Sequence, residues 1–86
     1  MGLRATYVLH LLPLFLNQTE VEHVWSKVRQ GFTIRQALKS SEKVQFLLNC
    51  SLEELELLSK NLDRSSQELL EEAIKLVSKE VVYRLD

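Results

Sequence analysis

The fold class is decided by residues 51–85, whose sequence is SLEELELLSKNLDRSSQELLEEAIKLVSKEVVYRL. Twice in this stretch a serine is followed three residues later by a glutamate, as Ser51/Glu54 and as Ser65/Glu68. In such a capping box the serine hydroxyl accepts a hydrogen bond from a helical amide, and the glutamate accepts one from the serine amide. Leucines recur at helical spacing after each box. The stretch therefore predicts helices over residues 52–62 and 66–85.

The same signature recurs upstream and predicts three further helices. Thr19/Glu22 and Thr33/Gln36 open apolar runs that predict helices over residues 20–30 and 34–49. Gly31 stands where a helix end favours the left-handed conformation, and Ser40-Ser41 is a point where the second of these helices could kink or split. The apolar run that follows Arg4 predicts a further helix over residues 5–12. It should end there, because Pro13 has no amide hydrogen to donate. We expect an all-α fold: a compact bundle of about five helices with a long C-terminal helix, forming one domain over residues 1–86.

Apolar periodicity also indicates which side chains form the core. Trp25 continues the stripe of Val21, Val24 and Val28, so we expect it in the main core. The C-terminal helix carries two apolar flanks, and a stripe this wide exceeds what one neighbouring helix covers. One flank includes Leu70, Ile74, Val77, Val81 and Leu85. The other contains three residues spaced seven apart, which form a candidate oligomer interface: Leu69, Leu76 and Tyr83.

The first sixteen residues admit two interpretations. Residues 5–16 are nearly all apolar and follow Arg4, as in a secretory signal. The small residues of a cleavage site do not follow Leu16, and the run is too short to span a bilayer. We therefore expect a buried N-terminal helix that packs against the bundle. If residues 7–16 cover the second flank of the C-terminal helix within one chain, that flank is not available to a second copy; this interpretation competes with oligomerisation.

Composition argues against several function classes. Cys50 is the only cysteine, so no disulfide forms within the chain, and it fits a reducing, cytoplasmic compartment. His10 and His23 have no carboxylate or thiol at metal-ligand spacing, and no nucleophile has a visible base. We expect His10 to be a partly buried, hydrogen-bonded core residue and His23 to be exposed. The sequence thus predicts neither an enzyme nor a cofactor or metal site, and no membrane association.

Charge is unevenly distributed although the net charge is only −1. Residues 23–49 carry a net charge of +4 and residues 50–72 a net charge of −5. The basic part has the layout helix, Gly31-Phe32-Thr33, helix, which resembles a helix-turn-helix. A DNA-binding regulator reading through residues 33–45 is therefore one interpretation, with four candidate contact residues: Arg35, Gln36, Lys39 and Lys43.

The favoured interpretation is a non-enzymatic module for helix-mediated protein–protein interaction, such as a small adaptor, inhibitor or regulatory subunit. A chain of 86 residues without disulfides or metals gains stability from added burial. We therefore expect a homo-oligomer, most simply a dimer, that also binds another protein. Binding to nucleic acid would instead place the functional surface on the basic residues and make affinity strongly dependent on salt.

Overall fold

The computed structural model describes residues 2–39, 41–79 and 84–85, and within them every regular element is a helix. The α-helices are α1 (Gly2–Leu11), α2 (Gln18–Arg29), α3 (Ile34–Ala37), α4 (Leu52–Ser59) and α5 (Arg64–Val77). Two 3-10 helices complete the elements of this part of the chain: η1 (Leu12–Leu14) and η2 (Glu42–Asn49). The prediction of an all-α fold is confirmed, and the longest helix is the one nearest the C-terminus.

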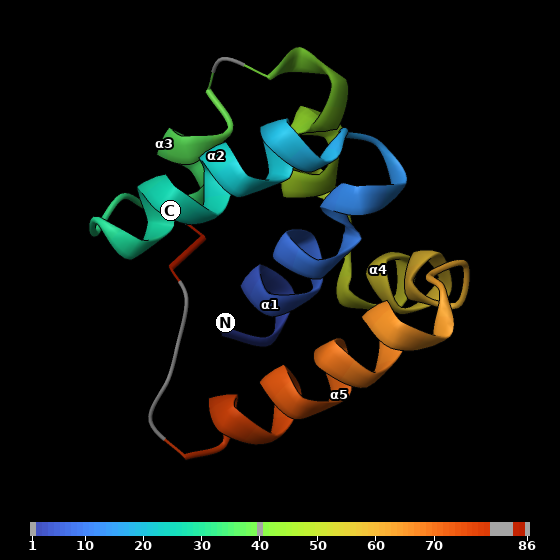
Figure 1. Cartoon of the computed structure of the whole chain (residues 1–86). Coiled ribbons are helices and arrows are strands. Elements are labelled where there is room, and N and C mark those ends of the chain that lie inside the picture. Colours follow the sequence, from blue (N-terminus) through green and yellow to red (C-terminus); the bar gives the residue numbers. More distant parts are fainter. Residues whose placement is uncertain (1, 40, 80–83, 86) are drawn as a thin grey trace.

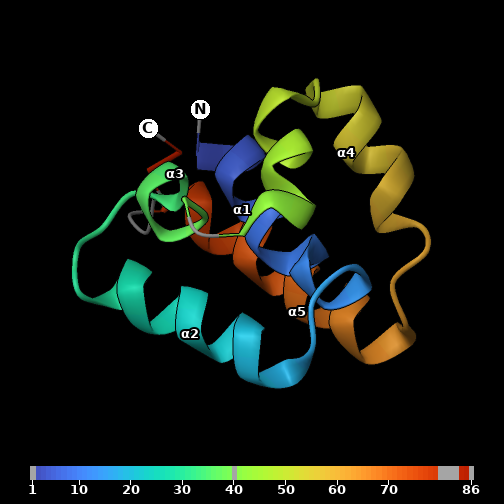
Figure 2. The same cartoon turned by 90° about the horizontal axis from the view of Figure 1, so that it is seen from above.

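The helix α1 lies in the middle of the molecule, between α2 and α5 (Figures 1 and 2). It packs against α4 and α5, whereas α2 packs against α3 and η1. The remaining helices thus surround α1 rather than stacking in separate layers, and the molecule measures 27 × 27 × 23 Å.

The burial of α1 follows from its apolar sequence. Val8, Leu9 and Leu11 are fully buried, as is Leu12 in η1. Thr6, the polar residue among them, donates its hydroxyl to the Gly2 carbonyl oxygen at 2.9 Å and so satisfies its hydrogen-bonding need inside the helix. The helix ends where Pro13 enters η1. The expectation of a buried N-terminal helix is confirmed.

Two of the four predicted helix caps are confirmed. Thr33 Oγ1 and Ser51 Oγ each accept a hydrogen bond, from the amides of Gln36 and Glu54 respectively, both at 3.2 Å. The side chains of these partners bond back to the cap amides, so both capping boxes are complete. Gly31 has a φ of +104°, which confirms the left-handed residue expected after α2.

The other two caps lie two residues earlier than predicted. The helix α2 is capped by Asn17, whose side chain accepts from the Glu20 amide at 2.9 Å, and not by Thr19. The helix α5 is capped by Asp63, which accepts from the Ser66 amide at 2.8 Å, and not by Ser65. Asn and Asp cap helices at least as well as Ser and Thr, so the hydroxyl pattern alone identified the wrong residue.

The continuous helix predicted over residues 34–49 is wrong. The helix α3 ends at Ala37, and η2 begins only at Glu42. In one straight helix Leu47 would lie about 140° around the axis from Ile34, so the two could not share a buried face. The break lets both be buried. Of the two serines expected at the weak point, Ser41 precedes η2 and Ser40 lies outside the described residues.

The last two helices are shorter than predicted. The helix α4 ends at Ser59 rather than residue 62, and α5 ends at Val77 rather than residue 85. Tyr83 and Val81 lie outside the described residues. Arg84 and Leu85 are not helical, and their carbonyl oxygens accept hydrogen bonds from the amides of Ile34 and Arg35 at 2.8 and 2.9 Å. The C-terminal residues therefore supply partners for the first two amides of α3.

Trp25 is less buried than the sequence predicts. It is half-buried and packs against the core from the side, with its ring edge-to-face on His10 at a centroid distance of 5.4 Å. The centre of the core consists instead of leucines from α1 and the residues around it. Trp25 therefore lies at the boundary between the core and the surface.

The central position of α1 leads to a testable expectation for stability. Replacing Leu9 with alanine removes a fully buried side chain and should lower the free energy of unfolding by about 2–5 kcal/mol. Urea unfolding followed by circular dichroism measures this loss. The matched control is Leu57→Ala on α4, where the side chain is 62% exposed and the loss should stay below about 1 kcal/mol. Equal losses in the two variants would contradict the central role of α1.

Candidate functional site

The most exposed apolar surface of the longest helix lies on one edge of α5. Leu69 and Leu76 are 57% and 46% exposed, although they stand two helical turns apart on the same side of the helix. Leu70 and Ala73, on the adjoining face, are buried against the rest of the molecule. We call Leu69 and Leu76 the α5 flank. The third residue of the predicted interface, Tyr83, lies outside the described residues.

The N-terminal segment does not cover this flank. The helix α1 packs against α5, but Leu69 and Leu76 stay exposed beside that contact. The competing interpretation, in which residues 7–16 cover the flank within one chain, is therefore wrong for the two described positions. Burial on one face and exposed leucines on the next give α5 the two flanks that its periodicity predicts.

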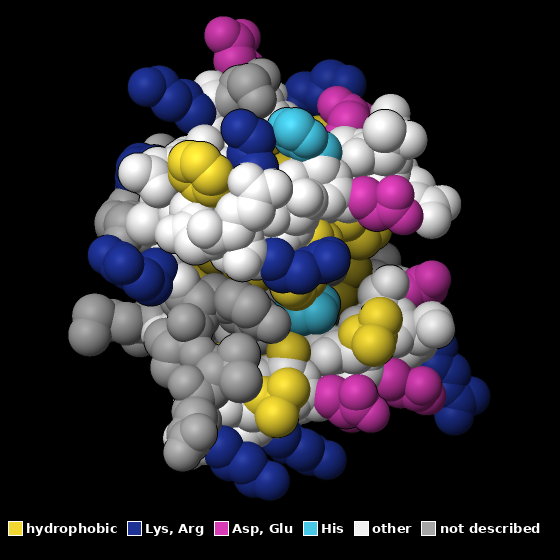
Figure 3. Space-filling model, turned by 60° about the vertical axis from the view of Figure 1, so that its left-hand side comes forward, with side chains coloured by type: hydrophobic (Ala, Val, Ile, Leu, Met, Phe, Trp, Pro, Cys, Tyr) yellow, Lys and Arg dark blue, Asp and Glu magenta, His cyan; other side chains and the backbone are white. Residues whose placement is uncertain are grey.

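A hollow separates the α5 flank from α2. Figure 3 shows apolar side chains and a histidine within this hollow, between the part of the surface formed by α2 and the part formed by α5. On the α2 side, Val21, Trp25 and Val28 are half-buried and follow one another at helical spacing. We call the space between this edge of α2 and the α5 flank the α2–α5 groove. Its two walls come from helices that α1 holds apart.

His10 on α1 is placed beside Trp25 and differs in part from its expected role. Its half-burial is confirmed, but its Nε2 atom is hidden from solvent and has no hydrogen-bond partner. Burial lowers the pKa of His10 from its ordinary value of 6.5, because the charged imidazolium loses hydration there. His10 is therefore held in its neutral form. His23 lies exposed on α2, as expected.

The four basic and polar residues of the DNA-binding interpretation do not lie on one helix. Arg35 and Gln36 belong to α3, Lys39 to the turn after it, and Lys43 to η2. Three of them come together with Gln45 around a cavity of about 360 Å³: Arg35, Gln36 and Lys39. The side-chain oxygen of Gln36 accepts a hydrogen bond from the Thr33 amide at 2.9 Å. The helix that would carry these residues into a groove of DNA is thus absent from the described part of this region.

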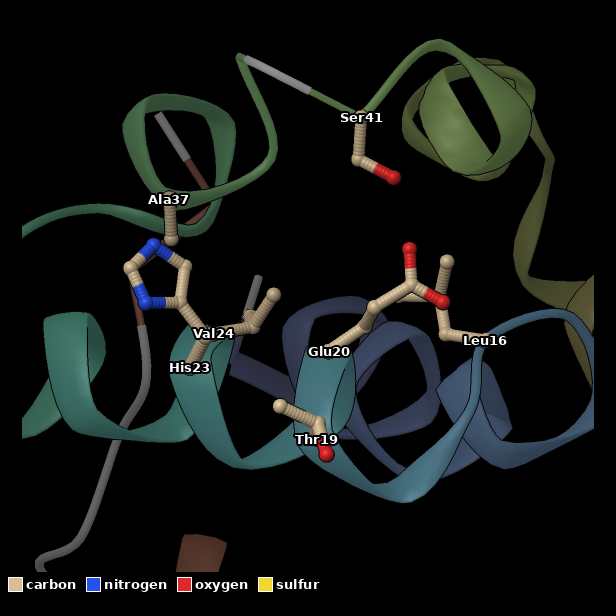
Figure 4. A pocket seen from close by; sticks show the side chains of 7 residues that line it. All are labelled: Leu16, Thr19, Glu20, His23, Val24, Ala37 and Ser41. Atoms are coloured by element: carbon tan, nitrogen blue, oxygen red, sulfur yellow. The ribbon is translucent and has the colours of Figure 1, made fainter.

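A second cavity, of about 300 Å³, lies between α2 and the segment after α3 (Figure 4). Three of its lining residues are buried and apolar: Leu16, Val24 and Ala37. Glu20 and His23 rise from α2; Ser41 points toward Glu20 from the opposite side, and the His23 ring stands beside Ala37 (Figure 4). The Glu20 carboxylate already accepts a hydrogen bond from the Asn17 amide at 3.1 Å, as part of the cap of α2. The cavity has room for a small apolar group and lies at the lower limit of ligand-sized pockets.

Cys50 has the chemistry of a structural residue. It is buried, and its thiol donates a hydrogen bond to the Phe46 carbonyl oxygen at 3.4 Å. Burial raises the pKa of the thiol, and the nearby Glu54 raises it further, although Arg4 acts in the opposite direction. The thiolate, which is the nucleophilic form, is therefore disfavoured. Among the residues that the structure describes, no group of three or more His, Cys, Asp or Glu side chains is placed to hold a metal ion.

The hydropathy of the helices was also compared with that of membrane spans. Within the described ranges, none of the helices combines the length and the apolar character needed to cross a bilayer.

The lowered pKa of His10 predicts an acid-sensitive fold. The unfolded chain binds a proton at this imidazole near pH 6.5, whereas the folded protein binds it only at lower pH. Between these values the unfolded state binds more protons, so the free energy of unfolding should fall as the pH decreases from 7 to 5. Urea unfolding at several pH values measures this slope.

Two variants identify the residue responsible. His10→Phe keeps a ring against Trp25 and removes the titrating group, so the slope between pH 7 and 5 should become smaller. His23→Asn removes the exposed histidine and should leave the slope as it is. The explanation would be incorrect if the His10 variant kept the full slope, or if the His23 variant lost it.

The chain was compared with protein-family models, with curated protein sequences and with solved structures, and none of the three comparisons finds a match. The surfaces of the molecule itself are therefore the source of functional information. Among the exposed large apolar side chains of the described residues, Leu69 and Leu76 are the two that lie on one side of the same helix.

Proposed function

We propose that this domain is a non-enzymatic module for helix-mediated protein–protein interaction, and that it self-associates through the α5 flank. The observation that carries the proposal is the exposure of Leu69 and Leu76 on a helix whose next face is buried. Single exposed leucines are common on protein surfaces, but two at a spacing of seven lie on one side of the helix, as residues of a helix–helix seam do. Such a side is the kind of surface that packs against another helix.

The energetics favour association of a chain of this size. Complete burial of a leucine side chain is worth about 1.5–3 kcal/mol relative to leaving it in water. In a symmetric dimer both copies contribute the same residues, so the flank is counted twice. A small domain without disulfides gains stability from this additional burial. We therefore propose a homodimer as the basic assembly. Its proposed role is that of a cytoplasmic adaptor, inhibitor or regulatory subunit.

A binding role fits the chemistry of the remaining polar groups better than catalysis does. The thiol of Cys50 is held in its protonated form and bonded to the Phe46 carbonyl oxygen. The Glu54 carboxylate accepts the Ser51 amide at 3.0 Å, and this hydrogen bond lowers the pKa of Glu54. These groups stabilise helix ends and the core.

The proposal predicts that Leu76→Glu separates the copies. A glutamate in the interface would have to lose its hydration, so the dissociation constant should rise at least about tenfold while the monomer stays helical. Sedimentation equilibrium over a range of low micromolar concentrations measures the mass, and circular dichroism measures helicity. The matched control is Leu57→Glu, which places the same charge at an exposed leucine of α4 and should leave the mass unchanged.

Two results would contradict the proposal of self-association. One is a wild-type mass near 10.0 kDa at every concentration. The other is an oligomer that Leu57→Glu disrupts as strongly as Leu76→Glu does, because the interface would then not be specific to α5.

A further inference from the structure

The α2–α5 groove has the form of a binding site for a helix. Its walls are the half-buried edge of α2, with Val21, Trp25 and Val28, and the α5 flank. The edge-to-face contact with His10 places the ring of Trp25 against α1, on the α2 wall of the groove. The helices α2 and α5 run in the same general direction in both views of the chain (Figures 1 and 2). A groove between two such helices accepts the apolar edge of a third.

Each wall of the groove carries a charged side chain beside its apolar residues. Arg29 is exposed and lies one turn beyond Trp25, on the same side of α2. Glu72 is exposed and lies between Leu69 and Leu76 on α5. Figure 3 shows basic and acidic side chains on both sides of the hollow, with a basic side chain directly above it and acidic side chains along its lower side. A partner helix that fits this groove therefore presents an apolar edge with a carboxylate directed at Arg29.

The helix α5 itself has this combination of groups. Its flank supplies the apolar edge, and Glu72 supplies the carboxylate. If a two-fold axis crosses α5 at right angles, the second α5 runs antiparallel to the first. It then also runs antiparallel to α2, because α2 and α5 share one direction within a copy. Both copies make the same contacts under this symmetry.

We propose that the α2–α5 groove of each copy receives α5 of a second copy of this chain, antiparallel to α2. Leu69 and Leu76 of one copy fill the groove of the other, and Glu72 of one copy pairs with Arg29 of the other. The apolar contacts supply most of the affinity, and the charge pairs set the direction of the helix. This inference rests on the proposed self-association and specifies the surface that receives α5.

Charge reversal tests the pairing directly. Arg29→Glu places two carboxylates together at each end of the interface, and Glu72→Arg places two guanidinium groups there. Each single variant should raise the dissociation constant about tenfold, since two pairs are lost per dimer. The double variant Arg29→Glu/Glu72→Arg restores opposite charges and should return the constant to near the wild-type value. Sedimentation equilibrium at 50 mM and 150 mM salt measures all four proteins.

Matched controls separate the pair from net charge. Lys75→Glu and Glu71→Arg make the same changes of charge on the exposed polar side of α5, and neither should alter the dissociation constant beyond twofold. Circular dichroism of every variant checks that the helices are retained. Since all four positions are exposed, no variant removes core packing.

The outcomes distinguish this inference from the function on which it rests. If both single variants weaken the dimer and the double variant restores its affinity, the result supports the groove as the binding site of α5 from the second copy. A dimer that Leu76→Glu separates, but that the reversals at Arg29 and Glu72 leave unchanged, overturns the groove and keeps the proposed self-association. A wild-type chain that stays monomeric overturns both. Weakening without recovery in the double variant overturns the pairing of these two residues.

Discussion

Helix α1 cannot be exposed to water, because Val8, Leu9 and Leu11 on it and Leu12 just after it need complete burial, and 86 residues provide few helices to cover them. The helices α4 and α5 lie against it, and Arg4 on α1 donates to the Leu48 carbonyl oxygen at 3.0 Å, which ties in the end of η2. This need for cover determines the surface as well as the core. With α1 between them, α2 and α5 cannot pack on each other along their full lengths. Each keeps an apolar edge that no neighbour hides, and the candidate binding surface is a result of that geometry.

Much of the fold could be predicted from local sequence. The burial of the N-terminal segment follows from its composition, and Thr33, Ser51 and Gly31 have the roles that their positions indicate. Prediction failed where residues of equal capping strength compete, as Asn17 does with Thr19. It also failed between Ile34 and Leu47, since a continuous helix satisfies local preferences there, whereas burial of both residues requires a break. Local sequence patterns do not show where the core lies in three dimensions, and that location decides where the chain must bend to bury Ile34 and Leu47.

The candidate site likewise has one part that the sequence could predict and one part that it could not. The spacing of Leu69 and Leu76 on one helix was sufficient to identify them, because one helix face follows from sequence alone. The opposing wall could not be identified. Trp25 belongs by periodicity to the core, and only the position of α1 shows that its ring lies at the edge of a groove beside His10. The basic residues illustrate the converse, because Arg35 and Lys43 share a helical stripe in the sequence but occupy separate elements in the fold.

The hydrogen bonds from Ile34 and Arg35 to the carbonyl oxygens of Arg84 and Leu85 join residues fifty positions apart in the chain. A helix of four residues cannot persist in water by its own propensity, so α3 depends on these late contacts. During synthesis the N-terminal part of the chain leaves the ribosome well before residue 85 does. Until then, two amides of α3 have water as their partner, and α1 lacks the cover of α5. These two hydrogen bonds can therefore form only after Arg84 and Leu85 have been synthesised.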